Sequence, residues 1–126
     1  TCEYGSGDAS ILGIRCDMDG LLVQEISDRT YKSKNDGVMH ACGHDGHTTM
    51  LLAAAECLAQ RKDFDGTIHF IFQPAEEIAP GGAVMMIEGG AIEGVDHIIG
   101  AHILPSLNII VSFGLSGFLY FILLPS

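Results

Sequence analysis

Short apolar runs and one longer amphipathic segment alternate along this chain. Residues 11–16 (ILGIRC) and 67–72 (TIHFIF) contain β-branched or aromatic side chains and are each followed by a turn signal, so both are predicted strands. Residues 47–61 have apolar positions at helical spacing and predict a helix. A short helix over 82–88 and a strand over 97–101 follow. The apolar stripe of the long helix would consist of Met50, Leu51, Ala54, Cys57 and Leu58.

The order strand, helix, strand, helix, strand predicts βαβ units. We therefore expect an α/β fold with a mostly parallel sheet flanked by helices. Residues 21–34 are mixed and polar, and predict a loop with a short strand near Leu22 and Val23. The carboxyl ends of parallel strands meet at one edge of a sheet, where ligands gather. Polar residues that follow the strands are the first candidates for chemistry.

The last segment differs from the rest of the chain. Residues 109–124 are apolar and uncharged, yet shorter than the roughly 20 residues that span a bilayer. A membrane anchor, a buried pair of strands and an aberrant end, such as a truncation or altered reading frame, are the three interpretations, and the last is favoured. The chain also lacks an initiating Met, so we expect it to begin inside a longer protein.

Charge and composition exclude several classes of protein. The chain of 126 residues has 6 Lys and Arg against 16 Asp and Glu, a formal charge of -10, which argues against a nucleic-acid partner. With 48% hydrophobic and 17% charged residues it is not expected to be disordered. Its four cysteines have no CxxC spacing, and no signal peptide precedes them. We expect reduced thiols, a cytoplasmic location and no membrane partner.

A dense set of metal-binding side chains lies at residues 40–47 (HACGHDGH). Thiolate and imidazole are preferred ligands of zinc-like ions, and on an extended loop the spacing of Cys42 and His44 places both on one side of the backbone. The alternative is a loop whose histidines cap the following helix or form hydrogen bonds. For a single histidine that alternative is favoured, but three His, one Cys and one Asp within eight residues favour a metal.

Two further candidates follow predicted strands. Glu76 and Glu77 come directly after the 67–72 strand, where one carboxylate could bind a metal and the other take a proton from water; a solvated acidic turn is the alternative. His102 follows the 97–101 strand and could complete a metal shell, although a lone histidine is more often structural. His69 and His97 are interpreted as structural.

Asp17 and Asp19 offer a rival interpretation. A hydrophobic strand followed by DxDG resembles the nucleophile motif of haloacid-dehalogenase-like phosphatases, in which the first Asp attacks phosphate. Such enzymes also need a downstream Lys, and no Lys follows Lys62. The phosphatase interpretation is therefore the weaker one.

Taken together, five segments resemble the metal-dependent amidohydrolase branch of the aminoacylase and carboxypeptidase superfamily, which includes hippurate hydrolases, N-acyl-amino-acid amidohydrolases and auxin-conjugate hydrolases. The resemblance runs from about Ile11 to Ser106, and HACGHDGH with QPAEE is its most specific part. The segments are RCDMDGL, GVMHACGHDGHTTMLLAAAE, GTIHFIFQPAEE, GGAVMMIEGG and VDHIIGAH.

The resemblance implies an α/β catalytic domain with two divalent ions, Mn²⁺ or Zn²⁺, that hydrolyses the amide bond of N-acyl amino acids or peptide-like conjugates. Glu76 would be the general base that takes a proton from water and later protonates the leaving amine. Asp19 would support the site from an outer position. The implied metal ligands are Cys42, His44, Glu77 and His102.

The resemblance also implies parts that this chain does not match. Relatives continue into a lid or dimerisation domain and then supply a late His ligand, and full-length relatives are expected to be homodimers. Gly20, Leu21 and Leu22 stand where the family usually has Ala and Leu-Pro. We therefore expect residues 1–106 to form an incomplete catalytic domain with impaired activity, and residues 107–126 to be an apolar tail. An inactive metal-binding remnant is the alternative.

Overall fold

A computed structural model describes residues 10–61 and 63–103 of the chain. Along the sequence it contains strand β1 (Ile11–Asp17), helix α1 (His44–Arg61), strand β2 (Thr67–Gln73), helix α2 (Gly82–Glu88) and strand β3 (His97–Gly100). The predicted order of elements is therefore confirmed. The predicted apolar tail, residues 107–126, lies outside the described residues.

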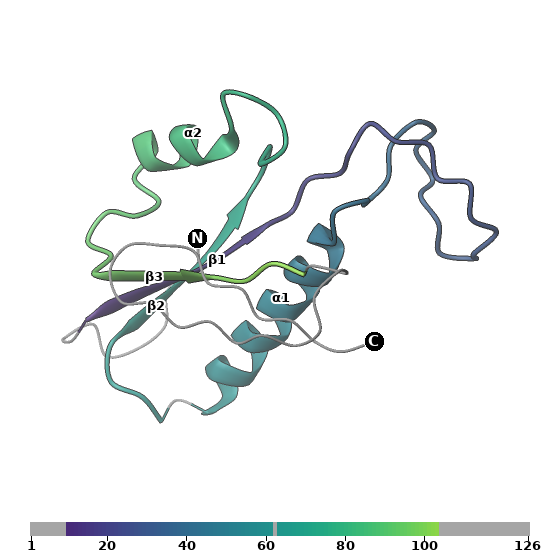
Figure 1. Cartoon of the computed structure of the whole chain (residues 1–126). Coiled ribbons are helices and arrows are strands. Elements are labelled where there is room, and N and C mark those ends of the chain that lie inside the picture. Colours follow the sequence, from purple (N-terminus) through teal and green to yellow (C-terminus); the bar gives the residue numbers. More distant parts are fainter. Residues whose placement is uncertain (1–9, 62, 104–126) are drawn as a thin grey trace.

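The three strands form one parallel sheet in the order β2-β1-β3. The chain first crosses from β1 to β2 on one side, and then passes β1 to reach β3 on the other. Right-handed crossovers in these two directions place the connecting helices on opposite faces of the sheet, which is how α1 and α2 lie in Figure 1. All three strands end at the same edge, and the central strand β1 ends between its two neighbours.

Helix α1 packs against β1 and β2 through a small apolar core. Leu51 contacts a cluster that contains Cys16, Ile68 and Phe70, each less than one tenth exposed. Ala55 and Leu58 extend this contact toward the end of the helix. Burial of these side chains is the main source of stability at the interface between helix and sheet.

The buried face of α1 differs from the predicted stripe. The helix begins at His44 rather than at residue 47, and its buried residues are His44, His47 and Leu51. Met50 and Cys57 are exposed. The polar side chains displace the stripe because His44 and His47 find partners at the end of β1, so this face is rotated toward them and away from Met50.

An extended segment, residues 20–41, separates β1 from α1 and is called the arm below. It projects away from the sheet (Figure 1) and contains neither a helix nor a named strand. The predicted short strand near Leu22 is reduced to one antiparallel bridge, between Leu21 and Met39. Two main-chain hydrogen bonds form that bridge, at 2.8 and 3.1 Å.

Candidate metal centre

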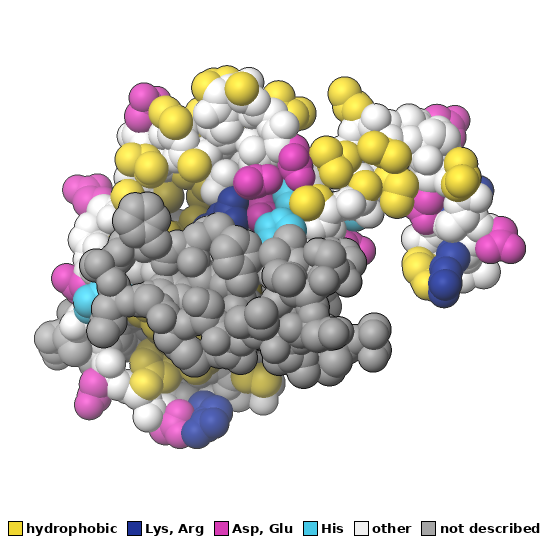
Figure 2. All heavy atoms as spheres, viewed as in Figure 1, with side chains coloured by type: hydrophobic (Ala, Val, Ile, Leu, Met, Phe, Trp, Pro, Cys, Tyr) yellow, Lys and Arg dark blue, Asp and Glu magenta, His cyan; other side chains and the backbone are white. Residues whose placement is uncertain are grey.

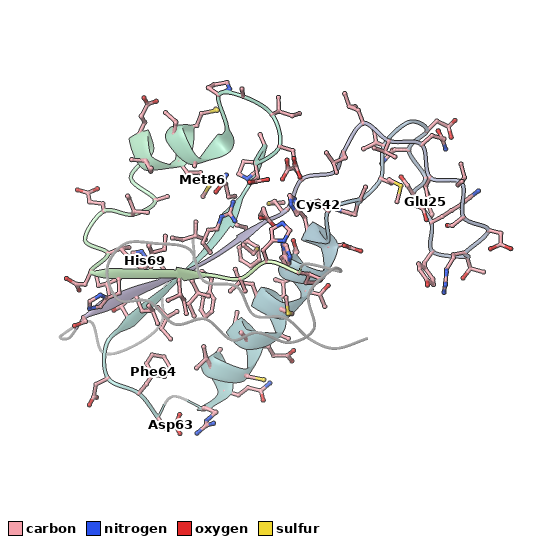
Figure 3. All side chains as sticks on the ribbon, in the orientation of Figure 1. Glu25, Cys42, Asp63, Phe64, His69 and Met86 are labelled. Carbon is pink, nitrogen blue, oxygen red and sulfur yellow. The ribbon has the colours of Figure 1, made fainter. Side chains whose placement is uncertain are left out.

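Four separate segments bring their polar side chains together at the carboxyl edge of the sheet. The end of β1 provides Asp17 and the residues just after it, the start of α1 provides two histidines and the preceding cysteine, and the other groups follow β2 and β3. Figure 3 shows Cys42 at the start of α1, in contrast to Glu25 far out on the arm. In Figure 2 acidic and histidine side chains gather between the arm and the rest of the chain. The sequence prediction placed Cys42 and His44 on one extended loop, whereas His44 is the first residue of α1.

His44 is the buried centre of this arrangement. Its Nδ1 lies 3.0 Å from Oδ1 of Asp19, which fixes the ring, and an ionised carboxylate there accepts the Nδ1–H. Its Nε2 is buried and has no hydrogen-bond partner. Oxygens of three carboxylates lie 3.7–3.9 Å from this Nε2, and they belong to Asp17, Glu76 and Glu77.

An imidazole lone pair that faces several carboxylates is unfavourable unless a positive charge lies among them, and a divalent cation is one group that supplies it. Two atoms bound to one zinc-sized ion in tetrahedral geometry are about 3.4 Å apart, because each bond is about 2.0–2.3 Å long. Ligand atoms of Cys42, His44 and Glu77 all lie within 4.8 Å of one another. The residues therefore fit a divalent cation in both chemistry and spacing.

Cys42 and His102 lie next to each other in the same site. Sγ of Cys42 lies 3.5 Å from Nε2 of His102, although the two residues are 60 positions apart. Nδ1 of His102 lies 2.8 Å from the carbonyl oxygen of Ile103 and donates its proton there. This tautomer leaves the Nε2 lone pair directed at the sulfur. A thiol and an imidazole are therefore next to the His44 group, as the predicted ligand set requires.

Burial raises the pKa of the Cys42 thiol to about 11, and a hydrogen bond with Glu77 and the negative charges of Glu77, Glu76 and Asp17 contribute in the same direction. The thiol is therefore protonated at neutral pH when no cation is nearby. A divalent ion reverses this effect, because it stabilises the thiolate and offsets the surrounding negative charge.

Asp19 joins the start of α1 to the turn after β2. Its Oδ1 faces His44 as described, and its Oδ2 accepts the main-chain N–H of Glu77 at 3.0 Å. Burial acts to raise the pKa of Asp19, but hydrogen bonds from the main chain of Glu77 and Glu76 outweigh it, so the pKa is lowered. Asp19 is thus an ionised group whose two oxygens orient other residues.

The turn that carries Glu76 and Glu77 is closed by two unusual backbone features. Ala75 has a φ of 49°, in the left-handed region. At Gly82, the first residue of α2, an added Cβ would lie 1.9 Å from the carbonyl oxygen of Pro74. Only glycine allows this approach, and the N–H of Gly82 then donates to the oxygen of Ala75 at 2.9 Å.

Three further residues lie near the metal site without being predicted ligands. The sequence pattern included His47 in the metal-binding segment 40–47 but gave it no role of its own, and it gave Asp17 and Arg15 no part in a metal site. Asp17 is fully buried at the end of β1; its Oδ1 lies 2.5 Å from Nδ1 of His47, and its Oδ2 lies 2.9 Å from the guanidinium of Arg15. Burial acts to raise the pKa of Asp17, but the His47 hydrogen bond and the Arg15 charge lower it overall. One signal could have indicated His47: on a helix, residues three apart such as His44 and His47 share a face. The DxDG motif indicated Asp17 only as a possible phosphatase nucleophile, and no local pattern indicated its pairing with His47.

This geometry disfavours the phosphatase interpretation. A nucleophilic Asp17 would need an exposed oxygen, but its side chain is buried and both oxygens face other side chains. His69 and His97 lie on β2 and β3, in the strand positions predicted for them. Cys16, Cys42 and Cys57 are free thiols, and Cys2 lies outside the described residues.

The comparisons with known proteins agree on a family of hydrolases. The sequence model of Peptidase family M20/M25/M40 matches residues 13–114. The N-acyl-L-amino acid amidohydrolase of Geobacillus stearothermophilus is 51% identical over 100 residues, 79% of this chain and 27% of that protein. The hippurate hydrolase of Campylobacter jejuni is 52% identical over 105 residues, 82% of this chain and 27% of that protein.

A solved structure shows the same arrangement of elements. A dinuclear metal binding peptidase of the M20 family from Bacillus subtilis matches with a TM-score of 0.78 at 46% identity, and the match covers 85% of this chain and 30% of that one. The chain thus spans about a quarter of the length of the curated relatives it matches. Within the described residues, neither helix has the length and apolar character needed to cross a membrane.

Proposed function

The chain belongs to peptidase family M20/M25/M40, and we therefore propose that it forms part of a metal-dependent amidohydrolase acting on N-acyl amino acids or related conjugates. The observation that carries this proposal is the buried Nε2 of His44, which faces carboxylates of Glu76 and Glu77 at 3.9 Å. The names of the bacterial relatives, an N-acyl-L-amino acid amidohydrolase and a hippurate hydrolase, support the substrate class.

The proposed ligands combine soft and hard donor atoms. The thiolate of Cys42 and the imidazoles of His44 and His102 suit Zn²⁺, and the carboxylate of Glu77 also suits Mn²⁺. The M20 relative from Bacillus subtilis is described as dinuclear, which supports two ions in the complete site. When bound, such a cation polarises a carbonyl group and makes water more acidic.

Glu76 is the proposed general base. Its Oε2 lies 3.9 Å from Nε2 of His44, the same distance as Oε1 of Glu77, but its side chain is 39% exposed against 28% for Glu77. A carboxylate that touches the site and keeps contact with solvent can take a proton from water and return it to the leaving amine. The Glu77 side chain is the less exposed of the two and forms a hydrogen bond with the Cys42 thiol, which supports Glu77 as the residue that holds a metal.

Metal content and amide hydrolysis test this proposal together. The 126-residue chain would be dialysed against chelator, reloaded with Zn²⁺ or Mn²⁺, and supplied with N-acetyl amino acids and hippurate while free amine is measured. We expect stoichiometric metal binding and metal-dependent release of amine. A chain that binds neither ion would contradict the metal centre itself.

The second candidate function is metal binding without catalysis. The grouping of ligand atoms of Cys42, His44 and Glu77 within 4.8 Å of one another would be sufficient for it. Metal binding with no hydrolysis of any substrate would then identify a non-catalytic metal-binding protein. The homodimer expected for the longer relatives, the cytoplasmic location and the division of the chain at residue 106 stay predictions.

A further inference from the structure

We propose that Asp17 and His47 form a brace that positions His102 for metal binding, and that His47 itself is not a metal ligand. The proposal rests on the function proposed above. Two groups of side chains are close enough to hold an ion, with ligand atoms within 4.8 Å of one another. One group contains Cys42, His44 and Glu77. The other contains Asp17, His44, His47 and His102. The hydrogen bonds of His47 show whether this residue can be a metal ligand, as the second group would require.

Both ring nitrogens of His47 are already engaged. Nδ1 lies 2.5 Å from Oδ1 of Asp17, and Nε2 lies 2.8 Å from the main-chain nitrogen of Ile103. The amide of Ile103 can only donate, so Nε2 must use its lone pair to accept that proton. The proton of the ring is then on Nδ1, where the carboxylate accepts it. No lone pair remains on the His47 ring for a cation.

Asp17 holds His47 from a rigid position. The residue is fully buried, and Arg15 donates to its second oxygen at 2.9 Å. The same guanidinium donates to Oε1 of Gln73 at 2.9 Å, which ties the end of β1 to the end of β2. In addition, Thr48 of α1 donates its hydroxyl to the carbonyl oxygen of Asp17 at 3.2 Å. Asp17 is therefore held to β2 through its carboxylate and Arg15, and to α1 through its main-chain carbonyl.

The brace reaches His102 through the peptide of Ile103. His47 accepts the N–H of Ile103, and the carbonyl oxygen of the same residue accepts Nδ1–H of His102. The rings of His47 and His102 are also in edge contact, with centroids 4.6 Å apart. His47 of α1 thus fixes the peptide of Ile103, and this peptide fixes the ring of His102. The Nε2 of His102 then faces the sulfur of Cys42.

Ile103 also lies close to the start of α1. Its Cδ1 is 2.8 Å from the position of a Cβ added at Gly46, and its Cβ is 3.5 Å from that of a Cβ added at Gly43. The side chain of Ile103 therefore packs directly on the first turn of α1. His102 follows a strand of only four residues at the edge of the sheet, so its position depends on this contact with α1. Groups that orient metal ligands in this way typically contribute 10–100-fold in affinity.

Two substitutions at His47 separate the two hydrogen bonds. In His47→Gln the amide can still accept the N–H of Ile103, because it extends as far as Nε2. In His47→Asn the amide lies near the position of Nδ1 and can still meet Asp17, but it is too short to reach Ile103. His97→Asn, at an exposed histidine on β3, is the matched control.

The affinity of the full chain for Zn²⁺ and Co²⁺ would be measured by competition with a chelator. We expect His47→Asn to weaken binding about 10–100-fold, with the same number of ions bound at saturation and the thiolate-to-cobalt absorption band retained. His47→Gln should keep most of the affinity, and His97→Asn should keep all of it. Exchange of the Ile103 amide in the metal-free chain should accelerate in His47→Asn only.

Three results would overturn the proposal. Loss of one bound ion in both His47→Gln and His47→Asn would make His47 a ligand. Equal affinity and equal Ile103 exchange in His47→Asn and the unsubstituted chain would remove its positioning role. Failure of the unsubstituted chain to bind any ion would instead remove the proposed function, and with it a ligand for the brace to position. Far-UV circular dichroism shows whether each variant folds.

Discussion

Nδ1 of His44 and Oδ1 of Asp19 lie 3.0 Å apart, although 25 residues separate them in the chain. This contact directs the other nitrogen of His44 toward the carboxylates of Glu76 and Glu77. Carboxylates that orient a histidine in this way fix its tautomer and raise its basicity toward a metal. Asp19 therefore acts on the proposed metal centre without lying among the proposed ligands.

Replacement of this carboxylate should weaken the metal centre without removing a ligand. We expect Asp19→Asn to lower metal affinity about 10–100-fold, because the group that accepts the Nδ1–H of His44 loses its negative charge. Chelator competition measures the change, and the number of ions bound at saturation should be unchanged. Asp28→Asn, at an exposed position on the arm, is the control. A fall in stoichiometry would show that Asp19 is itself a ligand.

Substitutions of the adjacent residues Glu76 and Glu77 should affect different properties, turnover in one case and metal affinity in the other. Glu76→Gln is expected to lower turnover about 10²–10⁴-fold, the usual contribution of a general base, with metal content unchanged. Glu77→Gln is expected to lower metal affinity first and turnover only as a consequence. Metal analysis and amine release on the same samples separate the two effects. If excess metal restored the turnover of Glu76→Gln, the proposed roles of the two residues would be wrong.

Metal affinity should increase with pH because Cys42 must lose its proton. Its pKa, raised to about 11 mainly by burial, means that metal binding releases a proton from the thiol throughout the neutral range. Affinity should then rise about tenfold per pH unit between about pH 8 and 10, above the range in which histidines ordinarily titrate.

Cys42→Ala should both weaken binding and flatten this dependence on pH. Cys57→Ala, at an exposed thiol on α1, should change neither property. Isothermal titration in buffers of different ionisation enthalpy would count the released protons directly. An identical slope in Cys42→Ala and the unsubstituted chain would exclude the thiol as the group that titrates.

The metal-free chain should lose stability in acid through Asp17. The pKa of this carboxyl is lowered in the folded state from its ordinary value of 3.8, because the contributions of His47 and Arg15 exceed the effect of burial. The resulting stabilisation is complete above pH 3.8 and is lost as the pH falls through the lower folded-state pKa. Denaturant unfolding at a series of pH values measures it.

Asp17→Asn should lower the free energy of unfolding at neutral pH and remove part of this acid dependence. The amide can still accept from His47 at one atom, but it has no charge to offset that of Arg15. Asp28→Asn serves again as the exposed control. The same dependence on pH in Asp17→Asn and the unsubstituted chain would show that other carboxyl groups cause the loss.

The sequence alone determined the elements and most of the candidate chemistry. β-Branched and aromatic runs predicted β1 and β2 to within one residue, because a buried parallel strand needs a continuous apolar segment. The Cys and His motif before α1 and the paired glutamates after β2 stood out because few other roles require such residues together. Their proximity followed from one rule of topology, that parallel strands end at the same edge.

Only the tertiary structure decided how these residues are oriented. The buried face of α1 includes His44 and His47 and leaves Met50 exposed, because polar partners at the end of β1 outweigh the apolar pattern. The pairing of Asp17 with His47 joins residues 30 positions apart. Local periodicity carries no information about such a hydrogen bond, since it depends on where two separate elements meet. The sequence thus indicated which groups could bind a metal, and packing determined which of their atoms are available to bind it.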